Sequence, residues 1–291
     1  MSPCTCPRSQ YIYNASAYGF SAEFERPLRH SIPTQAGAVL GAEGGRGVGQ
    51  VQDFKFDSLI SVKDAHTEVG GSYDDCHDRF TTYATSTLEG VNIGSGMLTA
   101  DQIVSKLHIY TPAPDDKDKK ESSFTITGSH FSNLRIAGYK ADVKLAAGFH
   151  TFDRYSRVSD AHLKSARDSW FLGDALGDPD GKGLQALEDE YHAIKGMGGL
   201  IKSWKQGQRT ERTTYWCSPV SITLEGLPPE SEIKVVGNMV FIPKFGVIRL
   251  VELVIHRSCR SLTMFRVQMC SGSDGSTGGG GTAGGGGAPP Q

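Results

Sequence analysis

The stretch DQIVSKLHIY (residues 101–110) alternates apolar and polar side chains over a length typical of a β-strand. One face carries Ile103, Leu107 and Ile109, and the opposite face carries Gln102, Lys106 and His108. Successive side chains of a strand point to opposite faces, so a strand with one face in a core shows this period of two. The stretch therefore predicts a strand that packs one face against a hydrophobic core.

The same period, or a run of β-branched and aromatic residues, recurs along most of the chain between Gly, Pro, Asn and Asp residues. Such segments are FTTYATSTL (80–88), SFTIT (123–127), LRIAGYKADVKL (134–145), SPVSITL (218–224), EIKVV (232–236) and SLTMFRVQM (261–269). FKFDSLISVK (54–63) reads as one further strand. GVIRLVELVI (246–255) is apolar on both faces, which favours a strand at the centre of the domain.

Helical periodicity is clear in GLQALEDEYHAIKG (183–196), where Leu184, Leu187, Tyr191 and Ile194 share one helix face. A second, weaker helical segment precedes it, so a helical insertion is expected at about residues 150–207. Residues 1–50 read as an N-terminal lead followed by a glycine-rich connector, and residues 51–270 as a single β-rich domain. Residues 271–291 are nearly half glycine, and their composition predicts a disordered tail.

Strands on both sides of the insertion, without strand–helix alternation, argue against a parallel α/β sheet. The expected fold is mainly β, either an antiparallel β-sandwich or a partly closed barrel. A β-solenoid is the alternative, although the sequence has no fixed repeat period.

Composition excludes some classes of function. Thirty basic and 32 acidic residues give a net charge of −2, which does not favour nucleic-acid binding. The most apolar run, VFIPKFGVIRLVELVIH (240–256), is interrupted by proline and charged residues and is not expected to cross a membrane. MSPCTCPRSQYIY (1–13) lacks the pattern of a secretory signal, and six cysteines are too few for a disulfide scaffold in 291 residues. A cytoplasmic protein with reduced thiols is the expectation.

The segment GGSYDDCHDRF (70–80) concentrates groups that bind zinc or react as thiols. Consecutive side chains of an extended strand point to opposite faces, so these groups converge only if the backbone curls. Asp and Gly are also the residues preferred in turns. We interpret the segment as a solvated hairpin loop, and leave open whether Cys76 and His77 ever bind a metal.

Three other segments resemble known motifs incompletely. DPDGKG (178–183) lacks both anchoring ligands of a calcium loop, and GGRGVGQVQ (44–52) precedes a strand rather than the helix that a phosphate loop requires. CTC (4–6) has no second cysteine pair at metal-site spacing. No catalytic, cofactor-binding or metal-ligating residue is therefore assigned, and no cofactor is predicted.

A basic stretch, Lys195, Lys202, Lys205, Arg209 and Arg212, lies close to one helical face. It could contact an anionic membrane or an acidic partner, but four neighbouring glycines weaken the helix and favour a solvated linker. The usual local signatures of hydrolases are absent. Whether the protein is an enzyme is undecided, and the balance favours a protein without catalysis.

Five segments together resemble an uncharacterised group of bacterial, soluble, strand-rich proteins. They are TSTLEGVNI (85–93), LTADQIVSKL (98–107), GSHFSNLRIAG (128–138), IPKFGVIRLVELVI (242–255) and RSLTMFRVQM (260–269). EGVNIGSGMLTAD (89–101) is also similar, over one hairpin, to bacterial surface domains of the choice-of-anchor type. The resemblance implies no catalytic residue.

The sequence thus favours a non-catalytic, β-rich binding or assembly protein of bacterial origin, whose ligand is unknown. One alternative is a hydrolase or metal-dependent enzyme with a site assembled across the sheet. Another is a structural component of a phage or secretion system. The partner is unknown, and a protein partner or self-association is left open.

Overall fold

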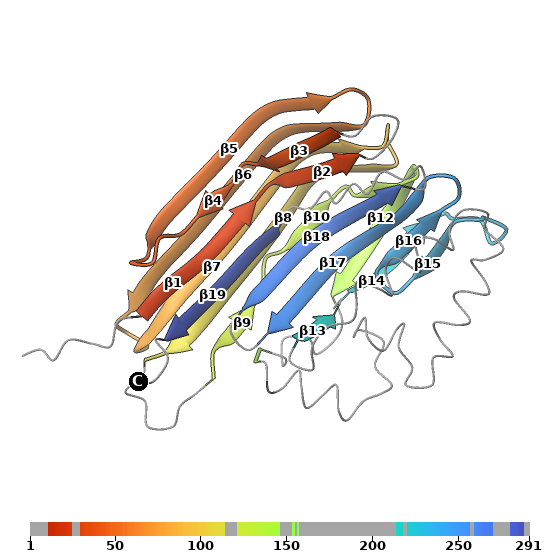
Figure 1. The fold of residues 1–291 in the computed structure, drawn as a ribbon. Helices are drawn as coiled ribbons and strands as arrows, with labels where there is room; N and C mark the ends of the chain where they lie inside the picture. Colours follow the sequence, from red (N-terminus) through yellow and green to blue (C-terminus); the bar gives the residue numbers. More distant parts are fainter. Residues whose placement is uncertain are drawn as a thin grey trace, which may run out of the picture.

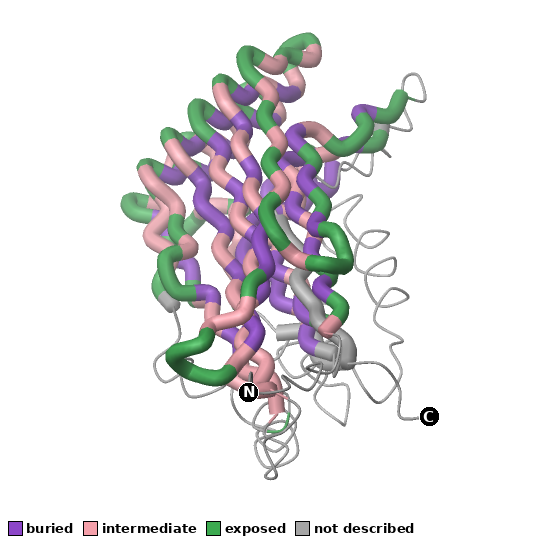
Figure 2. Tube along the Cα trace, turned by 90° about the vertical axis from the view of Figure 1, so that its left-hand side faces the viewer, coloured by how far each residue is buried: buried purple, intermediate pink, exposed green. Residues whose placement is uncertain are grey.

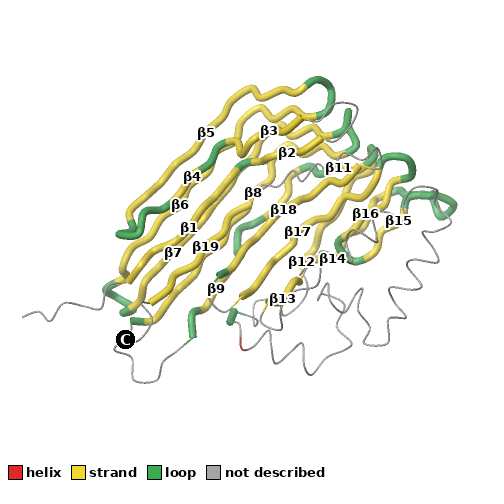
Figure 3. The backbone as a smooth tube through the Cα atoms, viewed as in Figure 1, coloured by secondary structure: helices red, strands yellow, loops and turns green. Residues whose placement is uncertain are grey.

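The computed structural model of the protein describes residues 11–24, 30–113, 121–145, 153–154, 156, 214–217, 220–256, 259–269 and 280–287. Nearly all of these residues lie in strands or in the turns between them (Figure 3). No helix among the described residues is long and apolar enough to cross a membrane. The predicted helical insertion at about 150–207 lies almost entirely outside the described residues.

One layer is a nine-stranded antiparallel sheet built on four long strands that follow one another as hairpins (Figure 1). These are β5 (Gly45–Phe56), β6 (Ile60–Asp74), β7 (Arg79–Ile93) and β8 (Leu98–Pro112). The free edge of β8 then pairs with three short strands, β9 (Ser123–Thr125), β10 (His130–Ser132) and β11 (Arg135–Ile136). The sheet ends with β12 (Tyr139–Leu145) and β14 (Val220–Glu225).

The second layer is an eight-stranded antiparallel sheet that joins both ends of the chain. Its order begins with β15 (Lys234–Val236), β16 (Met239–Ile242), β17 (Gly246–His256) and β18 (Arg260–Met269). It continues through β19 (Gly280–Gly287), β1 (Tyr11–Tyr18) and β4 (Ala38–Val39), while β13 (Thr214–Cys217) pairs with β17. β2 (Phe20–Phe24) and β3 (His30–Gln35) form a separate hairpin.

The two sheets pack face to face, with β1, β19 and β18 over β6, β7 and β8. Their inner faces share one hydrophobic core, to which the nine-stranded sheet contributes Leu88, Leu98 and Leu107 and the eight-stranded sheet Leu253 and Leu262. Figure 2 shows buried positions alternating with less buried ones along the strands. The mainly β, antiparallel prediction is confirmed, and its sandwich form agrees with this packing. Neither sheet closes on itself, and the antiparallel hairpins differ from the coils of a solenoid.

A line of irregularities crosses the long strands. Two consecutive residues face outward at Lys63–Asp64, Glu89–Gly90 and Asp101–Gln102, and neighbouring β5 has a positive φ of 51° at Asp53. Pairing skips one position between β5 and β6 and between β7 and β8, and two positions between β6 and β7, and it resumes in the same register each time. Each strand therefore changes which alternate residues face the core as it crosses the line.

The glycine-rich segment differs from its prediction. Composition predicts a disordered tail over residues 271–291, but Gly280–Gly287 form β19 between β1 and β18. β19 pairs with β1 along its whole length and with β18 at Gly280–Ala283, and this pairing satisfies backbone groups without apolar side chains. β19 packs over β7 and β8, whose inward residues include the small side chains Ala84, Ser86 and Ser105.

Two other boundaries differ from the sequence-based expectation. FKFDSLISVK does not form one strand, because the chain reverses at Asp57–Leu59 between β5 and β6, where Asp57 has a φ of 46°. The predicted lead and connector over residues 1–50 also contain β1 to β4 and the start of β5. By contrast, GVIRLVELVI forms β17, buried and paired on both sides as predicted.

Candidate ligand-binding site

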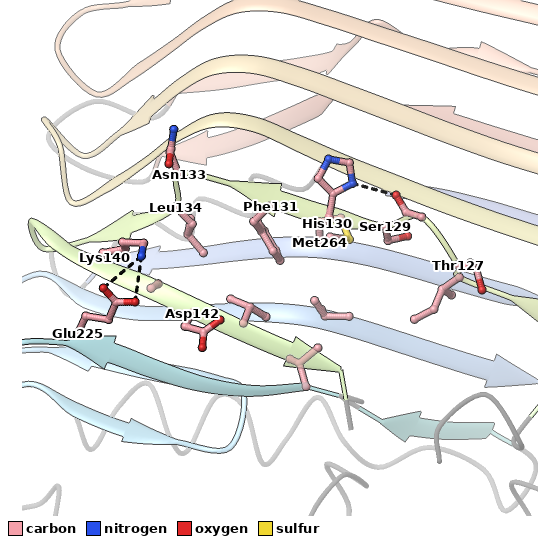
Figure 4. Close-up of a pocket in the computed structure, with 16 residues that line it drawn as sticks. Thr127, Ser129, His130, Phe131, Asn133, Leu134, Lys140, Asp142, Glu225 and Met264 are labelled. Atoms are coloured by element: carbon pink, nitrogen blue, oxygen red, sulfur yellow. Dashed lines mark hydrogen bonds and ion pairs between the residues drawn. The ribbon is translucent and has the colours of Figure 1, made fainter. Parts of the chain in front are cut away.

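The described residues enclose a pocket of about 440 Å³ within the nine-stranded sheet, between β10 and β12 (Figure 4). Its walls come from the chain between β9 and β11 on one side and from β12 and β14 on the other. Its floor comes from the opposite sheet. The lining residues are Ile126–Phe131, Asn133, Leu134, Lys140–Val143, Val220, Glu225, Val251 and Met264.

The pocket exists because β10 and β12 diverge. β10 pairs with β8, whereas β12 pairs with β14 along its length and with β11 only at its start. One backbone hydrogen bond joins the two walls near this junction, from Ala141 N to Leu134 O at 2.8 Å. Beyond it, no strand pairing between β10 and β12 is found in the described part of the chain. The sheet is thus split, and the split opens onto the interior of the sandwich.

Local sequence explains why the first wall leaves the sheet. Ile126–Ser129 form a turn closed by Ser129 N to Ile126 O at 3.1 Å, with Gly128 at a φ of 88° that favours glycine. Ser129 Oγ then accepts from Lys106 N at 2.8 Å and donates to Lys106 O at 3.1 Å. The Ser129 side chain therefore replaces a backbone partner of Lys106 on the edge of β8, and the main chain at Ser129 lies farther from β8 than a paired strand would.

The floor of the pocket coincides with an irregularity in the other sheet. Leu250 and Val251 both belong to the core, so β17 changes its inward face between them. Asn238 holds Leu250 from both sides: its backbone oxygen accepts from Leu250 N at 2.9 Å, and its amide Nδ2 donates to Leu250 O at 2.9 Å. Val251 follows with a φ of 53°, which is rare for a β-branched residue. Together with Met264 of β18, it presents an apolar surface at the base of the split.

The rim is polar and its charges are paired. Lys140 Nζ lies 3.0 Å from Glu225 Oε1, with about half of each side chain exposed. Lys144 Nζ lies 2.9 Å from Asp142 Oδ2, and this hydrogen bond raises the pKa of Lys144 above its ordinary value. Exposed pairs of this kind contribute little stability. Their consequence is geometric, because they fix charged groups at one mouth of an apolar pocket.

The segment DDCHD lies elsewhere, in the turn between β6 and β7, and its prediction as a hairpin loop is confirmed. His77 Nδ1 donates to Asp74 Oδ2 at 2.7 Å, and Arg79 Nε donates to the same oxygen at 3.1 Å. Desolvation raises the pKa of Asp74, but these two hydrogen bonds outweigh it and the pKa lies below its ordinary value. Cys76 is exposed.

These interactions stabilise the turn. Tyr73 also donates its hydroxyl hydrogen to Asp78, across the base of the turn. Within the described residues, no group of three or more His, Cys, Asp or Glu side chains is placed to hold a metal ion.

Of the other segments named in the sequence analysis, one lies in a strand and the rest lie outside the described residues. All of GGRGVGQVQ except Gly44 forms the first part of β5, which is paired with β6. CTC, DPDGKG and the basic stretch from Lys195 to Arg212 lie outside the described residues. The pocket was not predicted. Its walls are visible in sequence only as short strands interrupted at Gly128 and Gly138, and no sequence pattern indicates that β12 pairs with a strand seventy-five or more residues later.

The family comparison covers most of this architecture. The model of a domain family described as a domain of unknown function, DUF8256, matches residues 11–256. The chain belongs to this family. The DUF8256 match runs from β1 to the end of β17 and includes both pocket walls and Val251, and it confirms the predicted resemblance to an uncharacterised family. No curated protein and no solved structure matches the chain.

Proposed function

We propose that this DUF8256 protein is a non-catalytic binding protein whose ligand enters the pocket between β10 and β12. The observation that carries the proposal is the split in the nine-stranded sheet, which leaves the apolar floor of Val251 and Met264 facing a polar rim. A volume of about 440 Å³ lies within the range of ligand-binding pockets, which are mostly apolar with a few fixed polar groups.

The hydrogen bonding of the lining residues supports binding rather than chemistry. Ser129 uses its hydroxyl to hold Lys106, and the His130 ring lies 3.0 Å from the backbone oxygen of Gly128. A nucleophile and its general base would be within hydrogen-bond reach of each other, and these two side chains are instead engaged with backbone groups. The acidic side chains of the rim are paired with lysines.

Met264 provides a direct test. With methionine methyl groups labelled with ¹³C, the probe 8-anilinonaphthalene-1-sulfonate, which joins apolar rings to a charged group, is titrated into the protein. We expect the Met264 methyl resonance to shift, and the resonance of Met269, which lies in the same strand outside the pocket lining, to stay unchanged.

Substitution of Ala141 gives the matched control. Ala141→Phe places a ring in the pocket and should abolish the shift at Met264, whereas Ala141→Ser leaves the space open and should preserve it. A Met264 resonance that does not respond to the probe, or that responds equally in Ala141→Phe, contradicts the proposal.

Assembly is a second candidate, favoured by β5. This strand ends the nine-stranded sheet, and its outer edge is not paired with another strand among the described residues. Val48 on β5 is 51% exposed. Unprotected edges of this length pair readily with other chains. Light scattering across a hundredfold range of concentration tests it, and a constant monomer mass contradicts assembly through β5.

A further inference from the structure

We propose that the ligand of this pocket is an extended peptide that inserts between β10 and β12 as an additional strand. The inference rests on the proposed binding function and adds the chemical class of the ligand. It is carried by the direction of the backbone groups along the two walls.

The β12 wall presents backbone donors and acceptors to the gap. In an antiparallel strand the N–H and C=O of one residue point to the same side, and successive residues alternate sides. Ala141 N donates to Leu134 O, on the side of β11, so Ala141 and Val143 direct their backbone groups away from β14. Val143 lies beyond the junction, where no paired strand faces it in the described part of the chain.

The β10 wall does the same from the opposite side. Lys106 bonds to Ser129 Oγ through its backbone N and O. Lys106 and every second residue from it along this part of β8 therefore direct their backbone groups toward the edge that β10 occupies. His130 and Ser132 of β10 are the partners of Val104 and Gln102, which have the same parity as Lys106. The backbone groups of Phe131, between them, therefore point toward β12.

A strand placed in the split would bridge the two walls, antiparallel to one and parallel to the other, because β10 and β12 run in opposite directions. Its backbone would pair with Phe131 on one side and Val143 on the other, and its inward side chains would contact the apolar floor. Its outward side chains would lie beside the Lys140–Glu225 pair (Figure 4). From Ala141 to the end of β12 the wall is five residues long, or about 14 Å at the rise of a strand, which suits three to five residues of peptide.

A compact small molecule fits these observations less well. It could cover Val251 and Met264, but it would leave the backbone groups of both walls without the regularly spaced partners that an extended main chain supplies. Addition of a strand to an exposed edge is a common mode of peptide recognition, with affinity from the main chain and specificity from alternate side chains.

The test begins with a random twelve-residue peptide library displayed on phage and selected on the whole protein. Recovered peptides are synthesised, and their affinities are measured for the wild type, Val143→Pro and Val143→Ala. Proline removes the N–H that faces the gap and breaks no bond to β14, whereas alanine keeps it. We expect Val143→Pro to weaken binding at least about fivefold more than Val143→Ala, the effect of a lost hydrogen bond.

A second measurement does not depend on the folding of a variant. Peptides N-methylated at alternate residues keep their side chains but lose the donors of one edge, and one of the two methylated series should lose binding to the wild type. If Val143→Pro and Val143→Ala bind equally, or if N-methylation has no effect in either series, strand insertion is wrong. If no peptide is recovered while the sulfonate probe still shifts Met264, only the strand inference fails. If both probes fail, the binding proposal fails with it.

Discussion

A row of buried hydroxyl groups crosses the inner face of the nine-stranded sheet. We predict that removal of one of these hydroxyl groups lowers the free energy of unfolding, whereas removal of its neighbours raises it. Thr67 of β6 pairs with Ser86 of β7, and Ser86 pairs with Ser105 of β8. All three are at most 1% exposed. Thr67 Oγ1 donates to Ala36 O at 2.6 Å, whereas the hydroxyl groups of Ser86 and Ser105 have no hydrogen-bond partner among the described residues.

Burial of a hydroxyl without a partner costs about 1–3 kcal/mol in proteins. Ser86→Ala and Ser105→Ala each remove a single buried oxygen, so we expect each to raise the free energy of unfolding by about 1 kcal/mol after some loss of packing. Thr67→Val has the same shape as the wild type but leaves the Ala36 carbonyl without this donor. We expect it to lower the free energy of unfolding by about 1–2 kcal/mol.

Urea denaturation followed by far-ultraviolet circular dichroism measures these differences, with equal slopes required for the comparison. Thr67→Ser, which keeps the hydroxyl and loses only a methyl group, is the control for Thr67→Val. The double variant of Ser86 and Ser105 tests whether the two changes in the free energy of unfolding add. They would not add if the two hydroxyl groups were hydrogen-bonded to each other. A serine variant that loses more than about 0.5 kcal/mol refutes the reasoning, since it means that the hydroxyl is satisfied.

Two further predictions concern the stability of glycine variants and the effect of His108 on stability at different pH. A Cβ at Gly246, where φ is 143°, would lie 1.9 Å from the backbone oxygen of Gln268, so Gly246→Ala should lose about 4 kcal/mol or more. Gly96→Ala, at a φ of 95° with nothing within 4 Å, should lose only the strain of about 1–2 kcal/mol, and equal losses in urea denaturation would contradict the steric account. Burial, and to a smaller extent Lys106, lowers the pKa of His108, so the unfolded chain binds a proton here at higher pH than the folded protein does. Stability should therefore fall as pH decreases below about 6.5, and the unfolding free energies of His108→Phe and the wild type, measured from pH 7.5 to 5, should change by different amounts.

The fold class could be predicted because alternation is a local property of each strand. It predicts the inward faces of β7 and β8 one segment at a time, and Ile103, Leu107 and Ile109, expected on the core face, are all buried. The same alternation predicts a single strand wrongly where it continues through a turn. Phe56 and Ile60 share a parity across Asp57–Leu59, so the sequence reads as one strand where the chain forms a hairpin.

The candidate site could not be predicted because it depends on pairing between distant segments. Ile126–Phe131, Ala141 and Val251 come from three separate parts of the chain and surround one space only because β12 pairs with β14. Glycine is common in turns, but Gly90 lies within β7 at the line of irregularities, with a φ of 59°. In both cases the local sequence does not determine the structure, because the structure depends on pairing with distant segments.

The position of β19 has a consequence for the order of folding. β5 to β8 pair with their neighbours in sequence and can form as soon as those segments exist. β1 cannot pair with β19 until residues from opposite ends of the chain meet, which carries a large loop-closure entropy and is intrinsically slow. Until then β1 and β18 expose adjacent unpaired edges over an incomplete core. The protein should therefore be most prone to association with other chains late in folding, after its long hairpins have formed and before β19 is in place.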